Sequence, residues 1–262
     1  MTTDPQQTPS RRAATAFARL HRAGEPLLLP NAWDHASARA LAEQGFPAIG
    51  TTSLGVAAAA GLPDGAAATR EETLRLAVAL GPGPFLLSVD AEGGFSDDPD
   101  EVAEFARELH TAGAVGINLE DGLGPAARHA AKIEAVKQAA PGLFVNARTD
   151  THWLGDGDGT LARLDTYRQA GADGVFVPGL TDLRAIEALV RHLDVPLNVL
   201  HSPGGPPVRH LADAGVHRIS VGSLLYRRAL GAALETMADL RAGRTPTGAT
   251  PSYDAVARLA LR

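Results

Sequence analysis

Short apolar runs of strand type alternate with helical stretches along this chain, and the alternation occurs eight times between residues 27 and 223. The helical period is clear in residues 99–112, where Val102, Phe105, Ala106 and Leu109 fall at positions i, i+3, i+4 and i+7. Eight strand–helix units within roughly 200 residues predict a closed parallel barrel rather than an open sheet. The predicted strands are residues 27–33, 48–53, 85–92, 115–121, 143–150, 174–180, 196–202 and 218–223.

Cap and turn residues support this reading of the chain. Asp98 is a predicted N-cap of the helix at 99–112, with Glu101 as its capping-box partner. The turn after the first strand, residues 30–34, lacks the G-x-G-x-x-G fingerprint of an open dinucleotide-binding sheet. Glycines at four predicted helix ends suit the left-handed C-cap that precedes a strand, namely Gly45, Gly113, Gly171 and Gly215.

We therefore predict an α/β fold, a (β/α)8 TIM barrel with an extra N-terminal helix at residues 11–23 and a C-terminal helical extension that ends in a helix near residues 253–261. Residues 1–10 are polar and interrupted by proline, and we expect them to be a disordered lead-in. Residues 11–262 are expected to form a single domain that includes the C-terminal helices.

Composition excludes several classes of protein. The chain has 262 residues, 30 acidic and 24 basic, for a net charge of −6, and it has no cysteine. Disulfides, cysteine-based zinc or iron–sulfur sites and a cysteine nucleophile are therefore excluded. The mild acidity and the lack of a Lys/Arg run argue against nucleic-acid or membrane partners. The uncharged stretch at 44–63 carries too many Gly and Pro residues for a lipid-facing helix. Since no secretory signal opens the sequence, we expect a cytoplasmic protein.

Polar residues follow the apolar runs where the predicted strands end. In a TIM barrel the carboxyl ends of the strands form the mouth in which chemistry takes place. We therefore expect these polar side chains to gather at one mouth. They are Thr52 and Ser53, Asp90 and Glu92, Glu120 and Asp121, Arg148 and Asp150, and His201 and Ser202.

Three acidic residues predict a metal site. Asp90 and Glu92 are two residues apart, so on a strand they share a face, and Glu120 follows the neighbouring strand. Three carboxylates in one pocket repel one another unless a cation joins them, and Mg²⁺ or Mn²⁺ suits such oxygen ligands. The alternative is a structural ion-pair network of Asp90 and Glu92 with Arg148.

Arg148 is a fixed cation that can bind a substrate carboxylate in bidentate fashion, although a salt bridge with Asp150 is an equally good reading. His201 is either a substrate-binding residue or a structural histidine. One member of the Glu120–Asp121 pair is expected to be a helix N-cap, and His129 to be a surface residue of the following helix.

The segments around these residues resemble those of the isocitrate lyase/phosphoenolpyruvate mutase superfamily. They are GFPAIGTTSLGVAAAAGLPDG, LLSVDAEGGF, GAVGINLEDG, NARTD and GVHRISVGSLL, in this order, and the similarity runs from about residue 27 to residue 240. The resemblance implies a TIM barrel that uses Mg²⁺ and forms a homo-oligomer, either a dimer or a tetramer built from dimers that swap the terminal helix.

The resemblance also implies roles for particular residues. Asp90 matches the principal metal carboxylate, Glu92 a residue that binds the metal through water, and Glu120 the third acidic member. Asp64 matches a catalytic acidic residue on a loop over the site, and Arg148 the arginine that binds the substrate. The turn that binds substrate oxygens comprises Thr52, Ser53 and Gly55.

The chain departs from the family after the strand at 115–121. Family members that cleave isocitrate or methylisocitrate have a Lys-Lys/Arg-Cys-Gly-His loop whose Cys supplies a proton, whereas residues 120–129 here read EDGLGPAARH. The longer gating loop of the mutases is also missing. We therefore expect a Mg²⁺-dependent enzyme that cleaves a C–C bond of a small 2-oxo or 2-hydroxy (di)carboxylate through a metal-stabilised enolate. Phosphonopyruvate or phosphoenolpyruvate P–C chemistry and a non-catalytic metabolite-binding barrel are the alternatives.

Overall fold

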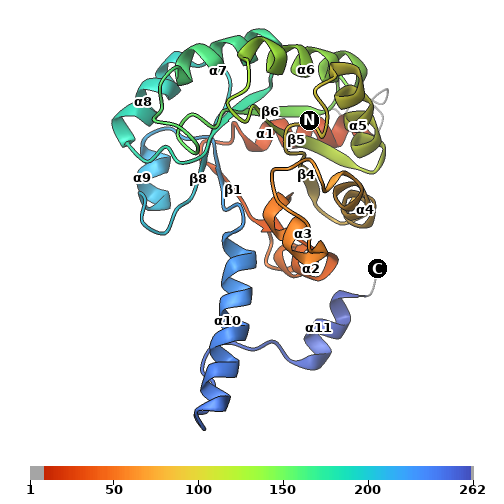
Figure 1. Cartoon of the computed structure of the whole chain (residues 1–262), viewed down its shortest axis with the longest axis vertical. Coiled ribbons are helices and arrows are strands. Elements are labelled where there is room, and N and C mark those ends of the chain that lie inside the picture. The colour runs from red at the N-terminus through yellow and green to blue at the C-terminus, as the bar shows by residue number, and fades with distance from the viewer. Residues whose placement is uncertain (1–8, 261–262) are drawn as a thin grey trace.

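Nine parallel strands form one sheet, in the order β1-β9-β8-β7-β6-β5-β4-β3-β2, in a computed structural model that describes residues 9–260 (Figure 1). The sheet curves into a nearly closed barrel, which confirms the predicted TIM-barrel class. The strands are β1 Leu27–Leu29, β2 Asn31–Ala32, β3 Ala48–Thr51, β4 Leu86–Asp90, β5 Ala114–Glu120, β6 Phe144–Arg148, β7 Gly174–Val177, β8 Leu197–Leu200 and β9 Arg218–Ser220.

The ninth strand arises because proline divides the first predicted one. Pro30 separates β1 from β2 and has no backbone N–H to give to a neighbouring strand. β1 pairs with β9, and β2 pairs with β3. The carbonyl of Pro30 still accepts a hydrogen bond from the Gly50 N–H at 2.8 Å. The segment that was predicted as one strand at 27–33 therefore joins the two edges of the sheet.

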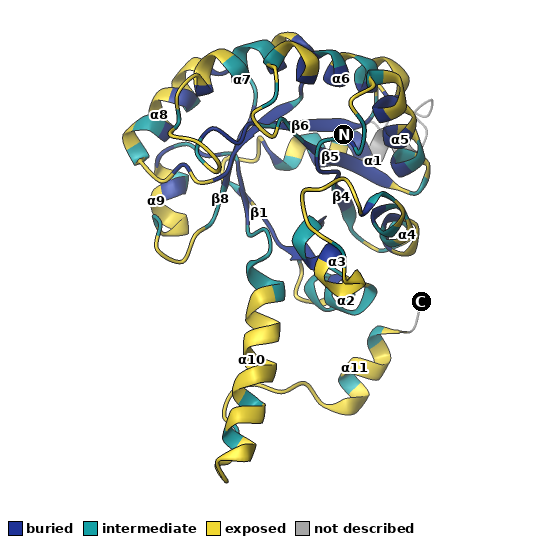
Figure 2. Cartoon of the chain, viewed as in Figure 1, coloured by how far each residue is buried: buried dark blue, intermediate teal, exposed yellow. Residues whose placement is uncertain are grey.

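Helices follow the strands and cover the outside of the barrel, as the arc from α5 to α9 in Figure 1 shows. α10 instead extends away from the barrel, and Figure 2 shows it exposed along most of its length. The helices are α1 Pro9–Leu20, α2 His35–Glu43, α3 Ser53–Ala60, α4 Arg70–Leu80, α5 Pro99–Thr111, α6 Ala126–Ala139, α7 Thr160–Gln169, α8 Leu183–His192, α9 Val208–Asp213, α10 Leu224–Arg241 and α11 Tyr253–Leu259.

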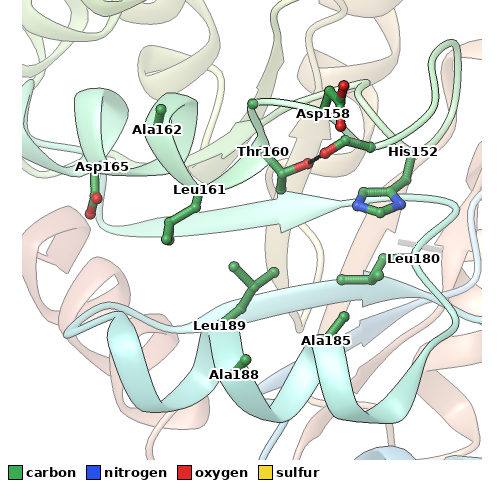
Figure 3. A pocket seen from close by; sticks show the side chains of 12 residues that line it. His152, Asp158, Thr160, Leu161, Ala162, Asp165, Leu180, Ala185, Ala188 and Leu189 are labelled. Carbon is green, nitrogen blue, oxygen red and sulfur yellow. Dashed lines mark hydrogen bonds between the residues drawn. The ribbon is translucent and has the colours of Figure 1, made fainter.

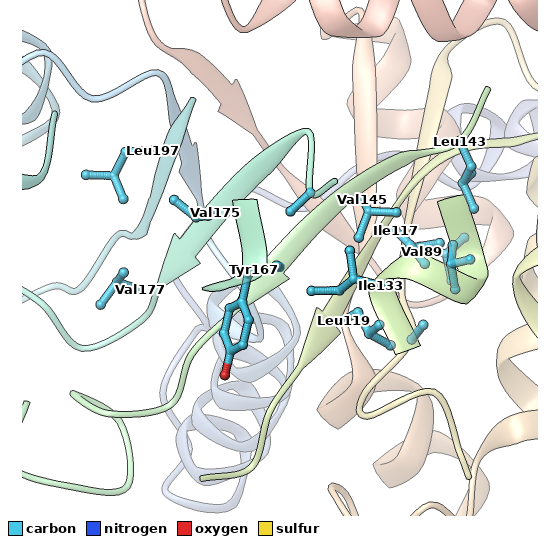
Figure 4. Packing of buried hydrophobic residues seen from close by; sticks show 14 of the residues in the cluster. Val89, Ile117, Leu119, Ile133, Leu143, Val145, Tyr167, Val175, Val177 and Leu197 are labelled. Carbon is cyan, nitrogen blue, oxygen red and sulfur yellow. The ribbon is translucent and has the colours of Figure 1, made fainter. Parts of the chain in front are cut away.

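The main core lies between the sheet and its helices (Figure 4). Alternate strand residues such as Ile117, Leu119 and Val145 are fully buried on the outer side of the sheet, where Ile133 of α6 and Tyr167 of α7 belong to the same cluster. The residues between them, which include polar side chains, line the barrel interior because strand side chains alternate between faces. Helix packing thus stabilises the barrel and leaves the interior available for polar groups.

A second, smaller core closes the amino-terminal end of the barrel. Phe17 of α1 is fully buried and meets Phe144, at the start of β6, edge to face at 5.4 Å between ring centroids. A Cβ atom on Gly116 would lie 2.8 Å from the Phe17 ring, so the approach requires glycine there. His21 stacks on Phe144, and its burial lowers the pKa of the ring to about 3.

The structure confirms the predicted N-cap of α5 but not its capping box. Asp98 does cap α5, but it accepts the Asp100 N–H at 2.9 Å, and Glu101 accepts a hydrogen bond from the Ser96 hydroxyl instead of completing a capping box. The four predicted helix-end glycines all have positive φ. At Gly113 the φ is 108°, and a Cβ would lie 2.8 Å from the backbone of Gly81, so no other residue fits without rearrangement.

Most of the predicted lead-in lies outside the described residues, which begin with α1 at residue 9. The final helix, α11, lies within the predicted C-terminal extension. Across residues 9–260, no helix is both long enough and apolar enough to cross a membrane.

Replacing Phe17 with alanine should lower the free energy of unfolding by about 3–5 kcal/mol, because the change leaves a cavity beneath the barrel. Urea unfolding followed by circular dichroism measures the loss. Arg19→Ala, at an exposed position on the same helix, is the control and should change stability by no more than about 0.5 kcal/mol. Equal effects of the two substitutions would contradict the conclusion that Phe17 of α1 closes the amino-terminal end of the barrel.

Candidate active site

Asp90 ends β4 and is held by the neighbouring strand. Its backbone N–H donates to Thr51 Oγ1 at 2.8 Å, and its Oδ2 accepts the Ser53 N–H at 3.1 Å. Ser53 is the first residue of α3, where backbone N–H groups have no partner within the helix. The amide that was predicted to bind a substrate oxygen is therefore engaged by Asp90 in this structure.

Glu92 is not on the strand, so the predicted shared face with Asp90 is wrong. β4 ends at Asp90, and Glu92 adopts a left-handed backbone with φ 47°. Its carboxylate is buried and accepts the Thr69 hydroxyl at 2.5 Å and the Ala67 N–H at 3.3 Å. Burial raises the pKa of Glu92, and the negative charge of Asp90 acts in the same direction.

Arg148, the last residue of β6, lies between two carboxylates. Its Nη1 is 2.7 Å from Glu120 Oε2, and its Nε and Nη2 are each 2.7 Å from Asp150 Oδ1. The predicted salt bridge with Asp150 is thus present. Among the described residues Arg148 forms no ion pair with Asp90 or Glu92, so that proposed network is wrong. A guanidinium has five N–H groups, so these contacts leave some of them for a ligand.

Glu120 shows how strongly the acidic groups of the mouth act on one another. Burial raises its pKa to about 8, Arg148 opposes the shift, and the charges of Asp90 and Asp150 add to it. Glu92 contributes in the same direction. The carboxylates therefore form one electrostatic cluster with more negative charge than Arg148 alone balances.

This excess of carboxylate oxygens fits a hard divalent cation. As the side chains lie, however, no group of three or more His, Asp or Glu residues within 9–260 is arranged to hold a metal ion directly. Glu92 uses its oxygens on Thr69 and Ala67, and Asp90 uses one on Ser53. Contact through water is consistent with this arrangement, because Mg²⁺ usually keeps several of its waters.

The other predicted residues lie around this cluster. Asp64 is on the exposed loop after α3, and partial burial together with the charge of Asp90 raises its pKa, while a hydrogen bond with Ser53 opposes the shift. His201 follows β8, four strands from β4 in the sheet, and its Nδ1 is buried without a hydrogen-bond partner. Contact of His201 with a substrate remains a prediction.

Thr52 and Gly55 have a packing role that the sequence did not reveal. Thr52 is buried, and a Cβ on Gly55 would lie 2.8 Å from Thr52 Cγ2 and 2.9 Å from the Cβ of Trp33. Glycine at 55 therefore allows Trp33 to approach α3. Contact of either residue with substrate remains a prediction.

Asp121 is not the helix N-cap that was predicted for the Glu120–Asp121 pair, and neither is Glu120, because α6 begins after Pro125. The Asp121 side chain is fully buried and accepts hydrogen bonds from Tyr167 at 2.6 Å and Arg163 at 3.0 Å. It also accepts hydrogen bonds from the Thr149 hydroxyl and the Asp150 N–H. Burial alone would raise the pKa of Asp121, but the hydrogen bond from Tyr167 and the other donors outweigh it and lower the pKa.

Two residues of α6 are buried, and for one of them, His129, the prediction was wrong. His129 is buried rather than on the surface, and burial lowers its pKa to about 4. Lys132 lines a cavity of about 320 Å³ together with Glu92 and Glu120. Its Nζ donates to the Gly93 carbonyl at 2.9 Å, and its side chain is almost completely buried. Helical periodicity is the only sequence signal that could have predicted that Lys132 lies on the buried face of its helix.

Another cavity, of about 640 Å³ against 320 Å³ for the one lined by Lys132, lies between α7 and α8 (Figure 3). Leu161, Leu180 and Leu189 point into it, and His152 and Asp165 lie at its ends. None of the clustered carboxylates lines this cavity, so we place the candidate site at the barrel mouth instead.

A parallel barrel with clustered carboxylates and an arginine at its carboxyl end has the arrangement of TIM-barrel enzymes, whose active sites lie at that face. The family model described as phosphoenolpyruvate phosphomutase matches residues 17–241. The chain therefore belongs to this family, within the isocitrate lyase/phosphoenolpyruvate mutase superfamily, which confirms the resemblance. Superfamily members are C–C lyases and mutases, and the chain is an enzyme of this group.

Several relatives cover most of the chain. An uncharacterized Mycobacterium tuberculosis protein is 44% identical over 93% of this chain and 96% of its own length. The 2-methylisocitrate lyase of Bacillus subtilis is 32% identical over 73% of this chain and 68% of its own. The oxaloacetate decarboxylase of Pseudomonas aeruginosa is 32% identical over 80% and 78%.

Among solved structures, a candidate lyase/mutase from Burkholderia cenocepacia J2315 has a TM-score of 0.86 and 37% identity, and the match covers 96% of each chain. Lyases of this superfamily generally use a divalent metal. The donor chemistry of the mouth agrees with that general property.

Replacing Tyr167 with phenylalanine should lower the free energy of unfolding by about 1.5–3 kcal/mol, because it removes a hydrogen bond to the buried charge of Asp121. Urea unfolding at neutral pH measures the change. Thr166→Ala on the same helix removes only an exposed hydroxyl and should alter stability by no more than about 0.5 kcal/mol. An unchanged free energy of unfolding in Tyr167→Phe would show that Asp121 does not depend on the Tyr167 hydroxyl.

Proposed function

We propose that this enzyme cleaves a C–C bond of a small 2-oxo or 2-hydroxy dicarboxylate. A 2-oxo substrate would keep the electron pair of the broken bond as a pyruvate-type enolate, which is then protonated. A 2-hydroxy substrate would lose its hydroxyl proton, become the 2-oxo product and leave the electron pair on the departing carboxylate fragment as an enolate, which is then protonated. The observation that carries the proposal is the arrangement of Arg148, which is fixed by Glu120 and Asp150 beside Asp90 and retains N–H groups for a ligand. A planar guanidinium in a fixed orientation suits a planar carboxylate.

Different residues of the mouth would bind the substrate and exclude water. Arg148 would orient the substrate by its carboxylate, Ser53 and Thr52 would contact substrate oxygens at the end of β3, and His201, which follows β8, would contribute from the other side of the barrel. Asp64 lies on the loop over the cluster and would restrict the entry of water. Fixed orientation of this kind lowers the barrier by placing the bond to be broken in one geometry.

Asp90, Glu92 and Glu120 would hold Mg²⁺ or Mn²⁺, with Glu92 acting through water because its oxygens are already occupied. The bound ion would supply positive charge that stabilises the negative charge developing on the 2-oxo group. Glu120 gives the clearest reason to expect a cation, since the surrounding carboxylates and burial raise its pKa to about 8 in the absence of one.

C–C chemistry is better supported than P–C chemistry. A phosphonate would need cations from the turn after β5, and the three nearby are already engaged. Arg128 pairs with Asp97 at 2.9 Å, Lys132 donates to the Gly93 carbonyl, and Arg163 pairs with Asp121 at 3.0 Å. The adjoining cavity is lined by four acidic residues and by one basic residue, Lys132. A phosphonate group carries up to two negative charges where a carboxylate carries one, so this surface disfavours a phosphonate more than a carboxylate in the same place.

We also propose that the enzyme is a homo-oligomer, a dimer or a tetramer, in which α10 packs on a second copy. None of the residues of α10 is buried, yet the helix exposes Leu230, Leu234, Met237 and Leu240. An apolar row of this kind on a projecting helix is typical of an interface.

The proposed reaction predicts release of pyruvate or a related 2-oxo acid when purified enzyme and Mg²⁺ are given small 2-oxo and 2-hydroxy dicarboxylates, oxaloacetate included. Coupled reduction of the product, CO₂ release and exchange of pyruvate methyl protons for deuterium are the readouts. Phosphonopyruvate is included so that P–C cleavage would be detected as free phosphate.

Asp90→Ala is the matched variant for this screen. We expect it to remain folded by circular dichroism, to lose Mg²⁺ binding in calorimetry and to lose at least about 10²-fold in turnover. Asp97→Ala removes an exposed carboxylate and should retain both properties. Binding of substrates without turnover in the wild type would favour the non-catalytic barrel, and Mg²⁺ binding by Asp90→Ala would refute the metal assignment.

The oligomer predicts that Leu234→Glu reduces the mass measured in solution by light scattering, since a charge would be placed in an apolar contact. Glu235→Ala, at the next exposed position, should leave the mass unchanged. A wild-type protein that is monomeric at micromolar concentration would contradict the proposed use of α10.

A further inference from the structure

A cavity of about 480 Å³ lies on the outside of the barrel, between α2, α4 and the turn that leads into β4. His35 and Arg39 are four residues apart and so lie on the same face of α2. Arg75 and Val78 lie one turn apart on α4, and Phe85 lines the cavity near the start of β4. No residue of the catalytic cluster lines this cavity.

The polar side chains of the cavity are basic, and two of them have buried nitrogen atoms without hydrogen-bond partners. Arg39 has no ion pair or hydrogen bond from its side chain within residues 9–260, and its Nε is buried. The Nε2 atom of His35 is also buried without a partner. Arg75 pairs with Glu72, which does not line the cavity, and no acidic residue does. Buried polar atoms without partners cost free energy, so a ligand that supplies acceptors gains affinity here.

The remaining wall is apolar. Val78 is 58% exposed, and Leu80, Pro82 and Phe85 continue the apolar surface. The volume falls within the range of small-molecule sites, which combine an apolar lining with a few polar groups. A site that is cationic at one side and apolar at the other selects an amphipathic anion.

We propose that this cavity binds a small organic carboxylate with a short apolar chain, at a site separate from the catalytic mouth. Arg39 receives the carboxylate, for which a guanidinium offers paired N–H groups, and His35 contributes a hydrogen bond from Nε2. The chain of the ligand lies against Val78 and Phe85. A free phosphate ion would use the cationic groups but not this apolar wall.

The test is calorimetric titration of the wild-type protein with hexanoate, and with inorganic phosphate and 1-hexanol as probes of each half of the site alone. We expect hexanoate to bind saturably with one equivalent per chain and at least about tenfold more tightly than either partial probe. Absence of saturable hexanoate binding up to about 10 mM would overturn the proposal.

Two variants locate the binding. Arg39→Met removes the cation and keeps the length of the side chain, and Val78→Asp places a carboxylate on an exposed wall position that tolerates a polar residue; each should weaken hexanoate by at least about tenfold. Arg184→Met removes an exposed arginine from α8 and should leave the affinity unchanged. Unchanged affinity in both cavity variants would place the hexanoate elsewhere and refute the site.

Discussion

The ion contacts of Arg148 with Glu120 and Asp150 are the interaction on which the rest of the mouth depends. They join the ends of β5 and β6 at distances of 2.7 Å and hold the guanidinium near Asp90, the carboxylate that ends β4. Asp150 is in turn fixed because its N–H donates to Asp121, which Tyr167 and Arg163 hold from α7. An outer helix therefore determines the orientation of a group that faces the substrate, through two buried carboxylates.

The barrel interior beneath the mouth contains a buried cation that acts on the carboxylates above it. Arg218 is almost fully buried, donates to Ser220 and to Asn118, and has no carboxylate within ion-pair distance among the described residues. Burial lowers its pKa to about 9, and the charge of Asp90 opposes the shift. The attraction is mutual, so a cation below the mouth also offsets part of the repulsion among the carboxylates above it.

The fold could be predicted because its causes are local. Apolar runs, helical periods and helix-end glycines each follow from short stretches of sequence, and only Pro30 changed the strand count. The site was predictable as a set of residues but not as a geometry. Alternation placed Glu92 beside Asp90, yet the left-handed turn sends its carboxylate to Thr69, a partner 23 residues away. The prediction of a helix N-cap at the Glu120–Asp121 pair rested on local sequence alone. Asp121 instead accepts a hydrogen bond from Tyr167, which lies 46 residues further along the chain, and no local pattern links the two residues.

The turn after β5 explains why neither family loop could operate here. The Leu123 N–H donates to Asp121 Oδ1, the Gly124 N–H donates to the Asp121 carbonyl, and Arg163 binds the Gly124 carbonyl at 2.8 Å. Opening this turn would break these hydrogen bonds, including the one that Arg163 donates while it also pairs with the buried Asp121. A gate at this side is therefore unfavourable. The loop that carries Asp64 is exposed instead, and it lines the same cavity as this turn through Gly65 and Ala67, whose N–H donates to Glu92.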